Sequence, residues 1–188
     1  MSLTPSNMLA LGTKAPNFTL YDTVSGKHLS LDLLKSEVAT VIMFICNHCP
    51  FVKHVNSGLI QLAHDYEPQG IRFIAISSND PTTHPEDGPD AMKIAAQTLG
   101  YPFPYLFDET QDVAQAYRAA CTPDFYVFDK QLSCVYRGQL DDSRPDNGIP
   151  VTGADLRKAL DHILRGEAVL PIQKPNIGCN IKWKEAHV

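Results

Sequence analysis

The chain has 188 residues, of which 44% are hydrophobic and 20% are charged, and its formal net charge is −5 at pH 7. This length and composition predict one globular domain with a sizeable core. No block of basic residues is present, which argues against nucleic acid and anionic membrane surfaces as partners. The longest apolar run, Val38 to Cys46, is far shorter than the roughly 20 residues that span a bilayer.

The N-terminal part of the chain predicts a hairpin followed by a short helix. Residues 12–20 are expected to form a loop that leads into a short strand. Ser25-Gly26 is expected to turn the chain, so that residues 27–31 pair back with this strand as a hairpin. Ser30 is a good N-cap residue, so a short helix is expected over 31–35.

The next segment predicts a buried strand joined directly to an amphipathic helix. Residues 38–45 form a continuous apolar run rich in β-branched side chains, which is typical of a strand covered on both faces. Helical spacing of apolar residues follows, at Phe51, Val55, Leu59, Leu62 and Tyr66. The proline and glycine of residues 67–70 are expected to end this helix.

The second half of the chain continues to alternate between strands and helices. Strands are predicted over 71–77, 104–108, 124–129 and 133–140, and helices over 90–100, 111–119 and 154–164. Thr152 is expected to cap the last helix and Gly166 to end it.

The order of these elements predicts an α/β domain with a mixed central sheet flanked by helices on both faces. We expect one domain over residues 1–188, with a core over about 12–166. Residues 167–188 are broken by prolines and predict an irregular C-terminal tail packed on the domain.

Cys46 and Cys49 lie where the buried strand passes into the helix, separated by Asn47 and His48 and followed by Pro50. Unpaired backbone N–H groups and the helix dipole favour an anion at a helix start. Together with His48 they are expected to lower the pKa of Cys46 to about 7 or below. We therefore expect Cys46 to be the more exposed, nucleophilic thiol, and Cys49, one turn into the helix, to be the buried resolving thiol.

The chain has five cysteines, which are too few and too irregular for a disulfide-stapled secreted domain. This pattern, and a start without a signal-peptide pattern, favour a reducing cytoplasm. Cys121 and Cys179 are candidate third redox thiols, with simple packing as the alternative for each. Cys134, in a predicted strand, is expected only to pack.

Neither metal nor cofactor binding is expected. The residues of loop 79–89 include acids and His84, but its prolines and aspartates predict a solvated loop. Asp141, Asp142 and Asp146 are likewise expected to be solvated turn residues. A structural zinc site would need four ligands, commonly two cysteine pairs, and the chain has one.

Several motifs resemble those of the thioredoxin-like superfamily. The Cys46-to-Pro50 motif after a buried strand, and Thr122-Pro123 before the strand over 124–129, resemble a thioredoxin active site. The segments over 12–20 and 178–184 are similar to the alkyl hydroperoxide reductase/thiol-specific antioxidant branch, in a peroxiredoxin-like group that carries Cys-x-x-Cys. The resemblance implies a thioredoxin fold with an N-terminal hairpin extension. It also implies a cis proline at 123, facing the dithiol.

The chain departs from both patterns at defined positions. Thr40 stands where thioredoxin has a buried aspartate, and Ile42 and Cys46 stand where peroxiredoxins have a proline and a threonine. The peroxiredoxin arginine has no counterpart around Thr122-Pro123.

The leading interpretation is therefore a thiol–disulfide oxidoreductase with Cys46 and Cys49 as catalytic residues, supported by Asn47, His48, Pro50, Thr122 and Pro123. Its partners would be a protein or small-molecule disulfide and a thiol reductant. One alternative is a weak thiol peroxidase, an antioxidant activity, using Cys49 or Cys46. The other is a non-catalytic thioredoxin-fold module that binds a metal or a protein.

Overall fold

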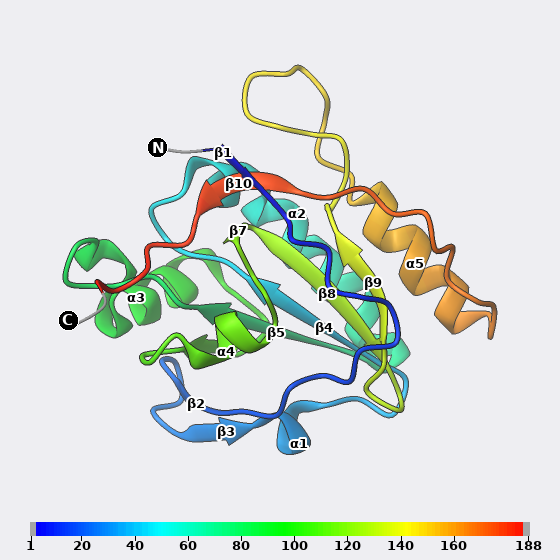
Figure 1. Cartoon of the computed structure of the whole chain (residues 1–188), viewed down its shortest axis with the longest axis horizontal. Helices are drawn as coiled ribbons and strands as arrows, with labels where there is room; N and C mark the ends of the chain where they lie inside the picture. The colour runs from blue at the N-terminus through cyan, green and yellow to red at the C-terminus, as the bar shows by residue number, and fades with distance from the viewer. Residues whose placement is uncertain (1–2, 186–188) are drawn as a thin grey trace.

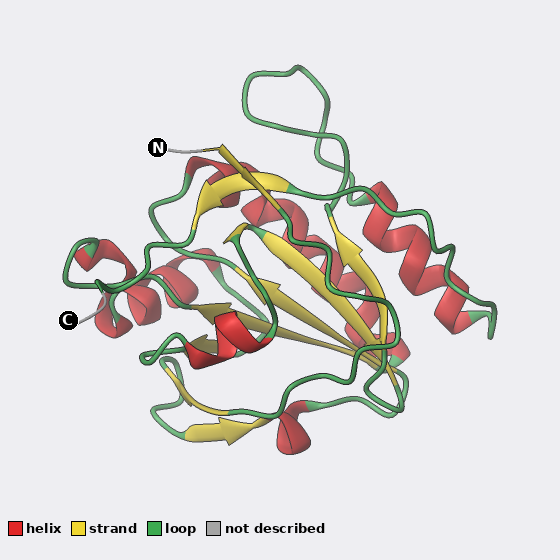
Figure 2. Ribbon diagram, viewed as in Figure 1, coloured by secondary structure: helices red, strands yellow, loops and turns green. Residues whose placement is uncertain are grey.

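The computed structural model describes residues 3–185 and contains a mixed central sheet (Figures 1 and 2). Its strands in this part of the chain are β2 (Thr19–Asp22), β3 (His28–Ser30), β4 (Ala39–Phe44), β5 (Ile71–Ser77), β6 (Tyr105–Phe107), β8 (Asp124–Asp129) and β9 (Cys134–Gly138). Their order in space is β3-β2-β6-β5-β4-β8-β9. Strands β4, β5 and β6 are parallel, and the other neighbours are antiparallel. The prediction of a mixed sheet with an N-terminal hairpin is confirmed.

Helices cover both faces of this sheet (Figure 2). They are α1 (Leu31–Leu34), α2 (Pro50–Tyr66), α3 (Pro89–Leu99), α4 (Asp112–Ala116) and α5 (Ala154–Leu164), with 3-10 turns η1 (Glu67–Gln69) and η2 (Pro85–Asp87). Helices α2, α3 and α5 pack on one face, and α1 and α4 pack on the other. In residues 3–185 we find no helix long and apolar enough to cross a membrane.

Strand β4 lies between these two layers, and its side chains alternate between them. Val41 and Met43 face the α2 side, whereas Ile42 and Phe44 face the α4 side, and all four are fully buried. Complete burial of an apolar side chain of this size contributes about 1.5–3 kcal/mol to folding. Because apolar side chains bury both faces of β4, its end is held in place, and the motif that follows starts from a rigid support.

Capping residues explain why several predicted helix boundaries are correct. The Ser30 side chain accepts a hydrogen bond from the Leu33 N–H, and α1 starts after it as expected. Gly100 adopts the left-handed conformation that ends α3. Helix α5 has the predicted bounds, but its N-cap is Gly153 rather than Thr152.

Helix α4 is shorter than the predicted 111–119 segment. Gln111 adopts a left-handed backbone conformation with φ 68°, which cannot continue a helix toward the N-terminus. Arg118 is also left-handed and stops the chain from continuing the helix on the other side. The buried Asp108 carboxylate accepts hydrogen bonds from the Val113 and Ala114 N–H groups, so a side chain from outside the helix satisfies its first turn.

The irregular tail predicted after Gly166 is wrong in one segment. Within the described residues, β10 (Ile177–Asn180) is the middle strand of a second sheet, between β1 (Leu3–Pro5) and β7 (Cys121–Thr122). Figure 1 shows β1 and β10 side by side across the end of the main sheet. The tail is therefore tied to the domain by backbone hydrogen bonds, and residues 186–188 of the predicted tail lie outside the described part.

Asp124, the first residue of β8, links this second sheet to the main one. Its carboxylate is fully buried and accepts hydrogen bonds from the Ser6 and Tyr126 hydroxyl groups. Burial raises the pKa of Asp124 to about 7, and these hydrogen bonds oppose the rise only in part.

This raised pKa predicts a pH-dependent stability. Between about pH 4 and 7 the unfolded chain has lost a proton that Asp124 keeps in the folded protein, so the free energy of unfolding falls as the pH rises. Urea unfolding at pH 5 and pH 7.5 should show this fall in the wild type. The fall in the free energy of unfolding should be much smaller in Asp124→Asn. In a control variant at an exposed position, Asp90→Asn, the fall should be as large as in the wild type. An equal fall in Asp124→Asn would contradict the assignment.

Candidate functional site

Strand β4 and helix α2 position the two cysteines of the motif. Ile45 extends the parallel pairing by donating its N–H to the Ile76 carbonyl oxygen, and Cys46 follows at once. Cys49 is the N-cap residue of α2, with Pro50 as the first helical residue. The relative exposures of Cys46 and Cys49 are 1% and 0%. Both cysteines are therefore buried, Cys49 as expected, and the expected difference in exposure between them is almost absent. Cys49 lies at the N-cap of α2 and not one turn inside the helix, which corrects that part of the prediction.

Both sulfurs lie against Thr122, whose bond to Pro123 is cis as expected. Cys46 Sγ is 3.4 Å from Thr122 Oγ1, and Cys49 Sγ is 3.4 Å from the Thr122 carbonyl oxygen. Residues more than 70 positions apart in the sequence are thus brought together, because β8, which follows Pro123, pairs with β4.

Cys179 completes a group of three cysteines. It belongs to β10, lies opposite Thr122 in the strand register and forms a disulfide with Cys49, with a Cα–Cα distance of 6.3 Å. Cys46 is a free thiol in this arrangement. The structure therefore places the tail cysteine at the dithiol, one of the two alternatives left open by the sequence.

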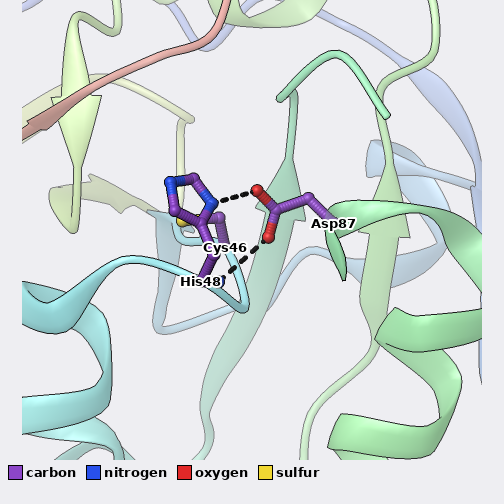
Figure 3. A group of neighbouring side chains, drawn as sticks. All are labelled: Cys46, His48 and Asp87. Carbon is purple, nitrogen blue, oxygen red and sulfur yellow. Dashed lines mark hydrogen bonds and ion pairs between the residues drawn. The ribbon is translucent and has the colours of Figure 1, made fainter. Parts of the chain in front are cut away.

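Asp87 holds the two residues between the cysteines (Figure 3). Its buried carboxylate accepts hydrogen bonds from the backbone N–H groups of Asn47, at 2.7 Å, and His48, at 3.1 Å. It also bonds His48 Nδ1 and accepts from Asn79 Nδ2 at 2.9 Å. The His48 ring lies in front of Cys46 in Figure 3. Asp87 thus fixes the ring by its Nδ1 and leaves Nε2 as the other nitrogen available for proton transfer.

Sequence reasoning missed Asp87, because the loop over 79–89 was expected to be solvated. That expectation is wrong for Asp80 and Asp87, which are 5% and 0% exposed. A topological signal was present: β4 and β5 are adjacent parallel strands, so the segments after their carboxyl ends meet at one edge of the sheet. A polar side chain in that loop was therefore in reach of His48.

The electrostatic environment reverses the expected pKa shift of Cys46. Burial and the nearby Asp87 carboxylate raise its pKa to about 12, opposed by hydrogen bonds from Thr122 and the Cys49 N–H. The helix start does not lower it below neutrality, because Cys46 lies three residues before the N-cap and is shielded from water. In this arrangement Cys46 is a protonated thiol.

The remaining predicted site residues have structural contacts. Asn47 accepts a hydrogen bond from the Tyr105 hydroxyl at 3.0 Å and donates one to the Glu86 carbonyl oxygen at 2.8 Å. Cys121 is a buried free thiol whose pKa is raised by burial. Cys134 packs in the α4-side core, as predicted.

Of the three loop acids expected to be solvated, Asp141 is buried. Its carboxylate accepts hydrogen bonds from the N–H groups of Ser143, Thr152 and Gly153. Asp141 therefore binds the backbone just before α5 instead of facing water.

Donor atoms of Cys46, His48 and Asp87 lie within 4.8 Å of one another, which is a spacing that a metal ion could bridge. The Asp87 carboxylate, however, already has four hydrogen-bond donors. Metal binding would require it to give up at least one of them.

Comparison with known proteins assigns the chain to a family. The family model described as AhpC/TSA matches residues 11–137, which includes the Cys46–Cys49 motif and the Thr122-Pro123 turn. The chain belongs to the AhpC/TSA family. Membership of this family supports a thiol-based redox function, and comparison with curated protein sequences gave no match.

Two solved structures are similar over nearly the whole length of this AhpC/TSA protein. An uncharacterized conserved protein from Geobacillus kaustophilus is 61% identical, with a TM-score of 0.98, over 100% of this chain and 99% of that one. A hypothetical protein from Sinorhizobium meliloti 1021 is 46% identical, with a TM-score of 0.94, over 97% and 100%. The second sheet and the tail thus lie within the region of similarity.

More distant structures establish the fold. The thioredoxin domain of a thiol-disulfide oxidoreductase from Bacteroides vulgatus is 18% identical, with a TM-score of 0.62, over 80% of this chain and 97% of that one. Together with the mixed sheet, this similarity shows that the AhpC/TSA protein has a thioredoxin fold, as predicted.

Proposed function

We propose that this protein is a thiol–disulfide oxidoreductase in which Cys46 attacks the substrate disulfide and Cys49 resolves the product. The observation that carries the proposal is the meeting of Cys46, Cys49 and Cys179 at Thr122, with one disulfide and one free thiol among them. Successive thiol–disulfide exchange requires a free thiol next to a disulfide, and this buried group of cysteines contains both.

The proposed reaction starts from the protein with all three thiols reduced. The Cys46 thiolate attacks one substrate sulfur, forms a mixed disulfide and releases the other substrate sulfur as a thiolate. The Cys49 thiolate then attacks Cys46, which releases the second substrate thiol and leaves a Cys46–Cys49 disulfide. Two electrons pass from the two cysteines to the substrate, and the two cysteine protons end on the two product thiols.

His48 is the proposed base for Cys46. A buried thiol with a raised pKa reacts only if a neighbouring group takes its proton, and His48 and Cys46 have polar atoms within 4.8 Å of each other. Asp87 would orient the imidazole, since it bonds Nδ1 and both backbone N–H groups of the motif.

Cys179 is proposed as the third thiol of the exchange. Its attack on Cys49 would break the Cys46–Cys49 bond, form Cys49–Cys179 and return Cys46 to a thiol. This last step transfers no net electrons, and it ends in the arrangement that the structure has. An external thiol reductant, as supplied by a reducing cytoplasm, would restore all three thiols.

Thiol trapping with peptide mapping tests this function. The reduced wild type, mixed with one equivalent of a small disulfide, should lose two thiols and give the Cys49–Cys179 peptide pair. Cys179→Ser should stop at a Cys46–Cys49 pair, and Cys46→Ser should react at least about 100-fold more slowly because its nucleophile is missing. Rapid oxidation of Cys46→Ser, or a pairing that omits Cys49, would overturn the mechanism.

A metal-binding module is the second candidate, favoured by the spacing of Cys46, His48 and Asp87. Bound Zn²⁺ would deprotonate Cys46 and block its exchange chemistry. Metal analysis of the purified protein, with and without a chelator wash, separates this candidate from the first. One equivalent of tightly held metal, together with slow oxidation, would favour the module.

A further inference from the structure

The edge of β7 is the place where a thioredoxin-fold site could hold a peptide. Cys121 and Thr122 form this short strand, which runs directly past the sulfurs of Cys46 and Cys49. An extended polypeptide binds such an edge by adding a strand, and its backbone hydrogen bonds bring its disulfide to the attacking thiol. A protein substrate therefore needs the β7 edge to be free.

In this protein the β7 edge is already occupied by the chain itself. Strand β10 pairs with it, with Cys179 opposite Thr122 and Asn180 opposite Cys121. The outer edge of β10 is paired in turn with β1, from Leu3 to Pro5. A peptide therefore cannot add a strand to this edge of β7, and both edges of β10 are paired.

The contact between β10 and the cis turn is also very close. A methyl group at Gly178 would overlap the Thr122 carbonyl oxygen and approach the Pro123 nitrogen. Only a glycine lets the two backbones approach in this way. The close fit distinguishes β10 from a loosely docked segment.

The tail is held on both sides of Cys179 by hydrogen bonds that do not involve the disulfide. Before it, the Asn176 side chain donates to the Pro123 carbonyl oxygen, and the Asn176 N–H donates to Ser6 Oγ. After it, Lys182 donates its N–H to Asn79 Oδ1 at 2.8 Å, and its carbonyl oxygen accepts from Gln111 Nε2 and the Asp80 N–H. Reduction of Cys49–Cys179 would therefore leave β10 in place.

We propose that β10 permanently fills the peptide-binding edge, so that the substrate is a small-molecule disulfide and not a polypeptide. This inference rests on the proposed function of Cys46. The approach left to a small molecule is through His48, which covers Cys46 and has a side-chain exposure of 13%. Rotation of the His48 ring and of the His84 ring, whose centroid lies 4.6 Å away, would open this approach, whereas a polypeptide would need β10 to leave. The bond from His48 Nδ1 to Asp87 would break while the substrate enters and form again before His48 takes the Cys46 proton.

Single-turnover oxidation of the reduced protein tests the substrate class. The reduced wild type is mixed with 2-hydroxyethyl disulfide or with insulin, and the loss of two thiols is followed by alkylation and mass spectrometry. Each rate is divided by the rate at which dithiothreitol reduces the same disulfide. The corrected rate for 2-hydroxyethyl disulfide should exceed that for insulin by at least about tenfold.

A variant and its control connect this preference to β10. Gly178→Ala should displace β10 from the Thr122 carbonyl oxygen. The ratio of the corrected rate for 2-hydroxyethyl disulfide to that for insulin should then fall by at least about threefold. Ile177→Ala, in the same strand at a position that is 42% exposed, should keep the wild-type ratio. If Gly178→Ala does not fold, amide hydrogen exchange of residues 177–182 in the wild type provides the second measurement. These amides should stay protected in both redox states.

The outcomes separate the two proposals. A corrected insulin rate equal to that of the small disulfide, or loss of β10 protection on reduction, overturns the small-substrate inference and leaves the oxidoreductase in place. If neither disulfide oxidises the protein, the proposed function itself fails, and the inference fails with it.

Discussion

Asp87→Asn should slow the oxidation of reduced protein by a small disulfide by about 100-fold at pH 7, a loss typical of an impaired acid–base group. The asparagine oxygen can still accept from the backbone N–H groups of Asn47 and His48, so the motif keeps its shape. The new amide N–H₂ would instead donate to His48 Nδ1, and the hydrogen bond that Asp87 accepts from Asn79 Nδ2 would be lost. The proton of the ring is then forced to Nε2, and His48 can no longer receive the proton of Cys46.

Removing the Asp87 charge would also lower the pKa of Cys46, which by itself would speed the reaction. The relative sizes of the two contributions to this pKa decide whether the rate rises or falls. Burial contributes more than the Asp87 charge to the raised pKa of Cys46. Loss of the charge therefore relieves only the smaller contribution, whereas loss of the ring orientation removes the proton acceptor. We expect the rate to fall, and the difference from the wild type to shrink at high pH, where hydroxide can deprotonate the thiol.

The matched control is Glu86→Gln, which removes an exposed carboxylate next to Asp87 and should leave the rate unchanged. Rates are measured by thiol trapping from pH 6 to 10. A faster reaction of Asp87→Asn at pH 7 would show that Asp87 acts only through its charge or by keeping Cys46 covered, and would contradict the role proposed for His48.

Cys179→Ser should lower the free energy of unfolding of the oxidised protein by about 2–5 kcal/mol. The Cys49–Cys179 bond closes a loop with a sequence separation of 130 residues, and such a long crosslink restricts the unfolded chain strongly. The folded state should persist, because β10 keeps its backbone pairing and its side-chain anchors.

Urea unfolding, followed by tryptophan fluorescence, measures this loss. Cys49→Ser should lose a similar amount, since it removes the same crosslink, and the reduced wild type should resemble both variants. Equal stability of the oxidised wild type and Cys179→Ser would contradict a formed Cys49–Cys179 bond in solution.

Most of the central sheet follows from local sequence patterns. The apolar runs of β4, β5 and β8 and the helical spacing of α2 and α5 are strong, because each element is buried over several residues. Strands β1, β7 and β10 have only three, two and four residues. They exist because distant segments pair, and such pairing leaves almost no periodicity to detect.

The site was predictable in its residue types but not in its environment. Cys46 and Cys49 follow from their motif at the strand–helix junction, and the cis Thr122-Pro123 turn follows from the resemblance to the thioredoxin-like superfamily. The pKa of Cys46 does not, because it depends on burial and on Asp87, which lies 41 positions away along the chain. The position of Cys179 depends in the same way on a strand that only tertiary pairing creates.

The middle position of β10 has a consequence for the synthesis of this protein. β10 is the last described strand to be made, yet the pairing of β1, one of the first, and of β7 depends on it. During translation the main sheet can form while Cys46, Cys49 and Cys121 still lack the strand that covers them. We therefore expect the nascent chain to be most open to wrong disulfide pairing just before residues 177–180 leave the ribosome.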